Sequence, residues 1–179
     1  RIMLETNNLS QTGSISPSPS VTTPNSVFIP NTPTLSITKI AGNSVPASAS
    51  GSYATPDITL SSTTTNPVSI EISATNIPAG TSVKITATPL HGSQTSADVT
   101  LAGTNASSTA TASMSISLTE PSVFTATTTF TIQTAMFYDG EKIEKVRVAA
   151  NVGKESDVTY ITESGKEIPA ALLTAKVMR

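Results

Sequence analysis

The chain has 179 residues, of which 57 are Ser or Thr and 12% are charged, and it contains no Cys and no Trp. A chain of this length forms one buried core by default, and its formal net charge of -2 leaves no basic excess to bind the phosphates of a nucleic acid. No run approaches the roughly 18 consecutive apolar residues that span a bilayer. Neither a nucleic-acid partner nor a membrane span is therefore expected.

Residues 1–33 form a predicted extended arm that is rich in Pro, Ser and Thr. Ser16-Pro17-Ser18-Pro19-Ser20 is followed by three further prolines, and such a composition favours polyproline II or irregular extended backbone without a core of its own. The compact apolar cluster of the arm is Val27-Phe28-Ile29, which we expect to be its docking point. The sequence leaves open whether this cluster docks on its own domain or on a neighbouring subunit.

Residues 34–133 alternate apolar and polar side chains with the two-residue period of a β-strand. Seven segments show the pattern: Leu35/Ile37, Ile58/Leu60, Val68/Ile70/Ile72/Ala74, Val83/Ile85/Ala87, Ala97/Val99/Leu101, Ala110/Ala112/Met114/Ile116/Leu118 and Phe124/Ala126/Thr128/Phe130/Ile132. Turn residues such as Ala41-Gly42-Asn43 and His91-Gly92 separate them. Seven short strands, each with one apolar and one polar face, predict an all-β fold in which two sheets pack as a sandwich.

The sixth and seventh segments predict specific core residues. Met114, Ile116 and Leu118 should face inward, while the serines between them face solvent or a sheet partner. On this register, replacing Ile116 by Ala should cost about 2–5 kcal/mol. Phe124 and Phe130 match the inward positions of their own segment, so both are expected in the core.

Residues 134–179 differ in character, since they hold 14 of the 22 charged residues. Ile143/Val146/Val148/Ala150 and Val158/Tyr160/Thr162 predict two more strands. Pro169–Ala175 fits either a short helix with Pro at its first position or a last strand. Because no Gly/Ser linker follows Ile132, we expect a charged C-terminal β extension continuous with the sandwich, and a separate lobe is the alternative.

Side chains that could carry catalysis or hold a metal are sparse. His91 is the only histidine and lies in a predicted turn, with no second His or Cys in the chain to join it. Asp139, Glu141 and Asp157 could offer carboxylates to calcium, but they form no ordered array of ligands. The 9 glycines are scattered singly, without a phosphate-binding loop. We therefore expect no enzymatic activity, no catalytic residue, no metal and no cofactor.

The aromatic residues supply one candidate contact with a partner. Sugar rings stack on exposed aromatic platforms, yet the chain has no Trp, three Tyr and four Phe. Tyr138, beside Asp139, is the candidate surface contact.

Two stretches carry a resemblance to a known class of protein. Ala74-Thr75-Asn76-Ile77-Pro78-Ala79-Gly80-Thr81-Ser82-Val83-Lys84-Ile85 and Ser107-Ser108-Thr109-Ala110-Thr111-Ala112, with Leu101-Ala102-Gly103-Thr104 between them, resemble exported bacterial surface proteins with Ig-like or fibronectin-like sandwich domains. The resemblance spans residues 34–133 and implies an Ig-like sandwich. It also implies a role as a surface module, an adhesin stalk or a filament subunit, without transferring any defined site.

Two functions of different class follow. The first is a non-catalytic structural subunit of an extracellular or cell-surface assembly, such as a bacterial filament or fimbria. In it, the arm would add to a sheet edge of a neighbouring copy, and Lys84 is the only Lys between residues 40 and 133 that could guard such an edge. The alternative is a monomeric surface module that binds a ligand or another surface protein through loops at one end of the sandwich.

Overall fold

The computed structural model describes residues 3–5, 20–22, 32–151 and 156–177. The chain divides into two compact units. One unit is residues 31–170, and the other is residues 1–30 with residues 171–179. Each unit is described by itself below.

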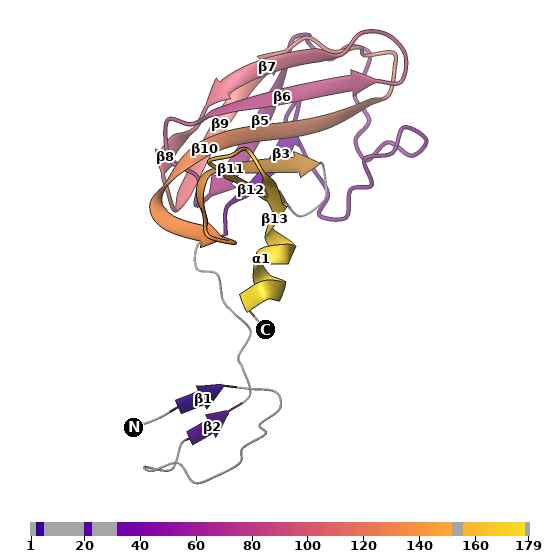
Figure 1. Ribbon diagram of the computed structural model, residues 1–179. Helices are drawn as coiled ribbons and strands as arrows, with labels where there is room; N and C mark the ends of the chain where they lie inside the picture. Colours follow the sequence, from indigo (N-terminus) through magenta and orange to yellow (C-terminus); the bar gives the residue numbers. More distant parts are fainter. Residues whose placement is uncertain (1–2, 6–19, 23–31, 152–155, 178–179) are drawn as a thin grey trace. The chain divides into compact units, whose positions relative to one another are not determined.

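The larger unit consists of two antiparallel sheets (Figure 1). The five-stranded sheet has the order β4-β3-β5-β9-β8, with β3 at Thr34–Ile40, β4 at Asn43–Ser44, β5 at Val68–Thr75, β8 at Ala102–Thr104 and β9 at Ser107–Met114. The six-stranded sheet has the order β13-β12-β11-β10-β6-β7, with β6 at Ser82–Pro89, β7 at Thr95–Thr100, β10 at Ser122–Tyr138, β11 at Glu141–Asn151, β12 at Asp157–Thr162 and β13 at Glu167–Pro169. The prediction of an all-β protein with two packed sheets is confirmed.

The core lies between the facing sheets, and the two-residue period places it there. On β5 the side chains alternate between buried apolar residues and more exposed Ser, Glu and Thr. β6 alternates in the same way. The facing layers are made by Leu35, Ile37, Val68, Ile70, Ile72 and Ala74 from one sheet and by Val83, Ile85, Ala87, Phe124, Ala126, Val146 and Val148 from the other. Burying these side chains supplies the main stabilisation of the unit.

Of the seven predicted strand segments, the one at Ile58/Leu60 is wrong and the sixth is wrong in part. Ile58 and Leu60 lie in an irregular connection, where the Ser61 hydroxyl bonds the N–H of Thr63 and so competes with a sheet ladder. The strand predicted over Ala110/Ala112/Met114/Ile116/Leu118 ends at Met114. Beyond it, the side-chain amide of Asn66 donates to the Ile116 carbonyl at 2.8 Å and accepts from the Ile116 N–H at 3.2 Å. This amide takes the place of a strand partner.

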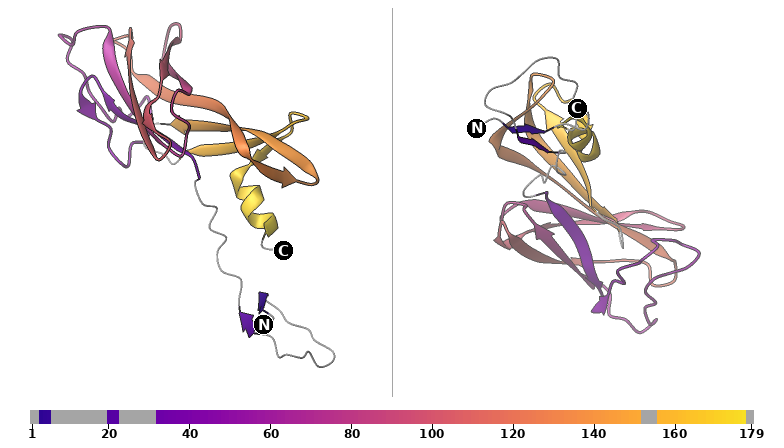
Figure 2. Two further views of the ribbon diagram at one scale, coloured as in Figure 1. Left: turned by 90° about the vertical axis from the view of Figure 1, so that its left-hand side faces the viewer. Right: turned by 90° about the horizontal axis from the view of Figure 1, so that it is seen from below.

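The aromatic residues of β10 also differ from one another. Phe124 is buried as predicted, whereas Phe130 is only half-buried. β10 continues past the facing sheet into the C-terminal hairpin with β11 (Figure 2).

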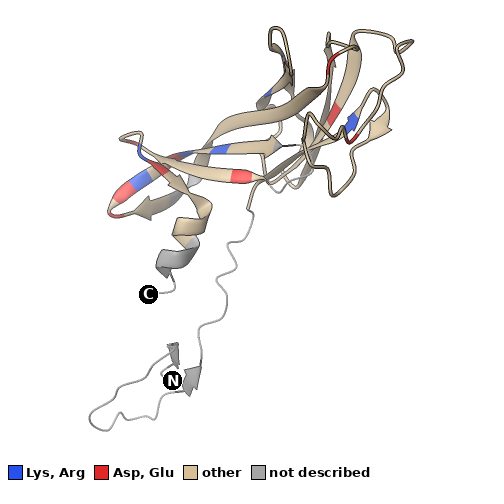
Figure 3. Ribbon diagram, turned by 90° about the vertical axis from the view of Figure 1, so that its right-hand side faces the viewer, with Lys and Arg blue, Asp and Glu red and all other residues tan. Residues whose placement is uncertain are grey.

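The C-terminal extension is continuous with the sandwich sheet because β10 runs unbroken through both. Residues 122–128 of β10 pair with β6, and β11 pairs with β10 as a hairpin from Thr125 to Tyr138, with a register shift between Thr131 and Met136. Asp139 and Gly140 close this hairpin with φ of +52° and +82°, as a two-residue turn of the type favoured by Asp-Gly requires. Figure 3 shows that charged residues gather on this extension, while few lie on the rest of the unit.

Two polar contacts fix the edges of the unit. The Ser156 hydroxyl accepts from the Leu35 N–H at 2.7 Å and donates to the Leu35 carbonyl at 2.8 Å, so it satisfies both backbone groups of this residue of β3. On the extension, the two guanidinium nitrogens of Arg147 donate to the two carboxylate oxygens of Glu167 at 2.7 and 2.6 Å. This ion pair connects β11 to β13 across β12.

The second unit contains little regular structure among its described residues. β1 (Met3–Glu5) pairs in parallel with β2 (Ser20–Thr22). The chain's last described element is α1 (Ala170–Val177), which begins directly after β13 ends at Pro169. The segment Pro169–Ala175, for which the sequence allowed either a helix or a last strand, therefore contains the end of a short strand followed by a helix. Among the described residues, no helix has the length and hydropathy to cross a bilayer.

Ile70 lies in a strand and Ile116 lies in an irregular connection, so replacing each by Ala should lower the free energy of unfolding by different amounts. Ile70 is fully buried on β5, so Ile70→Ala should lower the free energy of unfolding by about 2–5 kcal/mol. Ile116 is half-buried after the end of β9, so Ile116→Ala should cost under about 2 kcal/mol rather than the value expected for a core strand. Urea unfolding followed by circular dichroism measures both, and equal losses would contradict the strand end at Met114.

The Arg147–Glu167 pair predicts an acid-sensitive contribution to stability. Its hydrogen bonds from Arg147 lower the pKa of Glu167 below the ordinary value of 4.5. Stability from a lowered carboxyl pKa is complete above the ordinary value and is lost as the pH falls through the pKa of the folded protein. Thermal unfolding between pH 6 and pH 3 should therefore change less for Glu167→Gln than for the unaltered chain. Glu163→Gln, at an exposed acid, is the control and should follow the unaltered chain.

Candidate functional site

The sequence-predicted contact residues fall in two places. Val27, Phe28 and Ile29 lie outside the described residues, so their docking stays a prediction. Tyr138 is the last residue of β10, half-buried at the hairpin tip, and the Lys166 ammonium lies 5.3 Å from the centre of its ring. Neighbouring Phe137 is 63% exposed, so it offers the larger apolar surface at this tip.

Charged groups at the hairpin tip are engaged within the chain. Lys166 Nζ lies 3.8 Å from Asp139 Oδ2 as well as over Tyr138. Hydrogen bonds from the side chains of Ser164 and then Thr162 lower the pKa of Glu141. These contacts hold the tip in one conformation and leave its carboxylates committed to protein partners.

The remaining candidates for chemistry are scattered. His91 is exposed on a turn, with Nδ1 3.1 Å from Glu120 Oε2. Asp157 begins β12 and pairs with Ala149, whereas Glu141 begins β11, so the two acids lie at opposite ends of the hairpin ladder. Within the described parts of the chain, no three His, Cys, Asp or Glu side chains come together as metal ligands.

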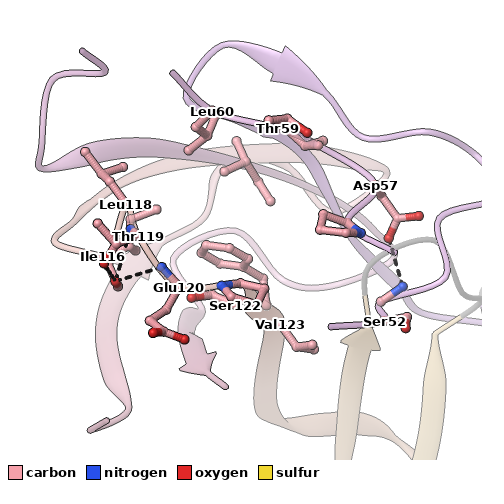
Figure 4. Close-up of a pocket in the computed structure, with 17 residues that line it drawn as sticks. Ser52, Asp57, Thr59, Leu60, Ile116, Leu118, Thr119, Glu120, Ser122 and Val123 are labelled. Carbon is pink, nitrogen blue, oxygen red and sulfur yellow. Dashed lines mark hydrogen bonds between the residues drawn. The ribbon is translucent and has the colours of Figure 1, made fainter. Parts of the chain in front are cut away.

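The structure instead contains an open apolar cavity at one end of the sandwich, called here the end pocket (Figure 4). Its volume is about 300 Å³, at the lower end of the range of ligand pockets, which runs from roughly 300 to 1,000 Å³. Two irregular connections form its walls, one before β5 and one between β9 and β10. The apolar lining consists of Ile40, Pro56, Ile58, Leu60, Ile116, Leu118, Pro121, Val123 and Phe124.

One wall of the end pocket is held by a carboxylate. Asp57 Oδ1 accepts from the Ser50 N–H at 2.8 Å, and Oδ2 accepts from the Gly51 N–H at 2.9 Å. These two backbone bonds lower the pKa of Asp57. The Tyr53 hydroxyl donates to the Thr88 carbonyl at 3.1 Å, which ties the same loop to the end of β6. The loop thus presents Ile58 and Leu60 to the cavity from a fixed backbone.

The opposite wall follows β9. Asn66 holds Ile116 through both hydrogen bonds of its amide, and the Ser117 hydroxyl accepts from the N–H groups of Thr119 and Glu120. Ile116 and Leu118 remain only half-buried. Figure 4 shows that Leu60 and Leu118 come from the two different connections. Both walls therefore offer apolar side chains that the core does not cover.

Two strands of the sandwich lack a second strand partner along at least part of their length among the described residues. β7 pairs with β6 on one side only, and β8 covers β9 only as far as Thr109, so the rest of that edge has no partner among the described strands. β9 then leads directly into the pocket wall at Ile116. On β7 the one charged residue is Asp98, and β9 has none. We call these two edges the free edges of β7 and β9.

Sequence reasoning missed the end pocket because it assigned the pocket residues to strand interiors. Ile58, Leu60, Ile116 and Leu118 continue the apolar alternation of real strands, so the local pattern does not distinguish them. The available signal was the density of Ser, Thr, Pro and Asn around residues 61–67 and 115–121, where side chains compete for backbone hydrogen bonds.

Asp57 provides a test of how the pocket wall is held. Asp57→Ala removes both acceptors of the Ser50 and Gly51 N–H groups, so the loop around Tyr53 should open more often. Chymotrypsin should then cut after Tyr53 at least several times faster than in the unaltered chain, as mapped by mass spectrometry. Asp98→Ala, which removes an exposed acid on β7, is the control. An unchanged cutting rate would show that Asp57 does not hold the loop.

Comparisons of the chain with protein-family models, with curated proteins and with solved structures give no match. A function for this chain must therefore follow from its own geometry. The two features that the geometry offers are the end pocket and the free edges of β7 and β9.

Proposed function

We propose that this chain is a non-catalytic structural subunit of an extracellular or cell-surface assembly, of the bacterial filament or fimbria kind. Its arm, residues 1–33, docks on a neighbouring copy by strand addition. The subunit body is an Ig-like sandwich.

Strand order supports the Ig-like assignment. The first seven strands of six or more residues, taken along the chain, are β3, β5, β6, β7, β9, β10 and β11. The first, second and fifth of them share one sheet, while the third, sixth and seventh share the other. Immunoglobulin-type sandwiches divide their strands between two sheets in this way. Here the fourth strand, β7, pairs with the third, and β12 and β13 extend the sheet beyond the seventh.

The observation that carries the proposal is the contrast between the edges of the two sheets. Part of the outer edge of β3 is satisfied by β4 and by the Ser156 hydroxyl, and β13 is only three residues long with Arg147 bound to its Glu167. Among the described strands, β7 has no hydrogen-bonded partner on its outer side and β9 has none there beyond Thr109, although β7 and β9 contact each other. Exposed edges normally carry Lys or inward-pointing charges that prevent pairing with another chain. An edge without them favours the addition of a strand.

The arm supplies a segment suited to such an edge. From Thr6 to Thr38 the sequence has no charged residue, and Val27-Phe28-Ile29 gives it one compact apolar cluster. A docked arm would gain backbone hydrogen bonds and apolar burial, which offset the conformational entropy it loses. Because the arm and β9 carry no charge, an arm that pairs with the edge of β9 would bury no charged group.

Two variants of the arm test the proposal. Removing residues 1–33, or making Phe28→Asp in the full chain, should leave a folded β domain by circular dichroism but abolish large particles in light scattering and electron microscopy. Ser26→Asp is the matched control, since it places the same charge in the same arm outside the apolar cluster, and it should still assemble.

Other outcomes of this experiment would contradict the proposal. Normal assembly of the truncated protein would show that the arm is only a tether. A full-length chain that stays monomeric under all conditions would favour a surface-binding module, with exposed Phe137 and neighbouring Tyr138 at the hairpin tip as its contact residues.

A further inference from the structure

We propose that Val27-Phe28-Ile29 of one copy occupies the end pocket of the next copy, so that the subunits join head to tail in an open-ended chain. This inference rests on the proposed function and adds the acceptor site and the direction of growth.

The first step concerns where the arm leaves the sandwich. Thr32 lies just before β3, and its carbonyl accepts a hydrogen bond from Asn76, the residue after the end of β5. Thr34 pairs with Thr75 at this end of the two strands, while Ile40 pairs with Ile70 at the other end. Ile40 is one of the residues that line the end pocket. The arm therefore departs at one end of β3, and the pocket opens at the other.

The second step is the reach of the chain. Eight residues of extended backbone from Thr32 to Ile40 span about 26 Å at the rise of a β-strand. Phe28 precedes Thr32 by four residues, which extend at most about 14 Å. Phe28 thus cannot enter the pocket of its own sandwich, even if the arm folds back along β3. A pocket that holds this cluster must take it from another copy.

The third step is the chemical match between segment and pocket. The cluster is flanked by Pro24 and Pro30, which lack an N–H and so limit any added strand to the residues between them. A short apolar strand needs a short acceptor with apolar side chains. The end pocket offers Leu60 and Leu118 from its two walls, with Phe124 from β10 also lining it. Its carboxylates have partners in the chain, Asp57 with Ser50 and Gly51, and Glu120 with His91.

Symmetry then determines the kind of assembly. Donor and acceptor are different surfaces at opposite ends of β3, so the interface is heterologous. Repeating a heterologous contact without ring closure generates a linear filament. An isologous dimer, in which both copies use one shared patch, does not follow from this arrangement.

The experiment uses full-length chains with one side of the contact disabled. Leu60→Asp places a charge in the pocket and should abolish assembly while the β structure persists. Leu90→Asp is the matched control, because Leu90 is 48% exposed and lies outside the pocket lining, and it should assemble normally. If Leu60→Asp fails to fold, Leu118→Asp on the opposite wall replaces it.

Mixing the two disabled chains gives the decisive result. Phe28→Asp keeps an intact pocket, and Leu60→Asp keeps an intact arm, so an equal mixture should form dimers and nothing larger in analytical ultracentrifugation. Assembly of Leu60→Asp alone, a mixture that stays monomeric, or a mixture that forms long polymers would each overturn the inference. If the unaltered chain itself never assembles, the proposed function fails first, and this outcome is distinct from the other three.

A peptide measures the contact directly. A fluorescently labelled peptide of residues 23–31 should bind the Phe28→Asp chain and raise its fluorescence anisotropy. The affinity should fall at least about tenfold when Leu60→Asp is added to that chain, and should not change when Leu90→Asp is added. The same peptide carrying Phe28→Asp should not bind. Equal affinity for the Leu60→Asp and Leu90→Asp chains would overturn the inference.

Discussion

Burial of every second side chain between two sheets is the interaction on which the rest of this structure depends. On β5 the chain places Val68, Ile70, Ile72 and Ala74 in the core. The residues between them are hydroxyls and one Glu. Hydroxyls tolerate solvent without adding charge, so the outer faces and edges of the sheets stay nearly neutral. The same alternation that builds the core therefore also leaves free edges without the charged side chains that usually guard them.

The end pocket is formed where this alternation continues beyond strand pairing. Ile116 and Leu118 keep the spacing of buried strand residues, yet the amide of Asn66 occupies the hydrogen-bonding groups of Ile116. The apolar side chain of Ile116 is then partly exposed to solvent, while its backbone N–H and carbonyl already have hydrogen-bond partners. The buried core and the proposed binding surface thus come from the same alternation of apolar residues. In the core the facing sheet covers the apolar side chains, whereas in the end pocket they stay partly exposed.

The sequence was sufficient to predict strands such as β5, β6 and β11. Apolar and polar side chains alternate with the same two-residue period in these strands and in the strands that pair with them. It did not predict the end of β9, because the residue that ends it, Asn66, lies 50 positions away. Nor did it predict that Asp139-Gly140 closes a hairpin between β10 and β11, although the turn chemistry was visible in that dipeptide. Local periodicity identifies which residues avoid water, whereas the partner that covers them depends on long-range pairing that a single sequence does not specify.

The antiparallel register of β3 against β5 has a mechanical consequence for a head-to-tail chain. In the proposed filament, tension would enter the subunit at the Thr34 end of β3 and would leave near Ile40, where the next arm would dock. A pull along the strand axis loads the hydrogen bonds from Thr34–Thr75 to Ile40–Ile70 together, in shear, rather than opening them one after another. Such a subunit would resist extension through the β3–β5 ladder beside the proposed docking site, which would suit a filament that carries load.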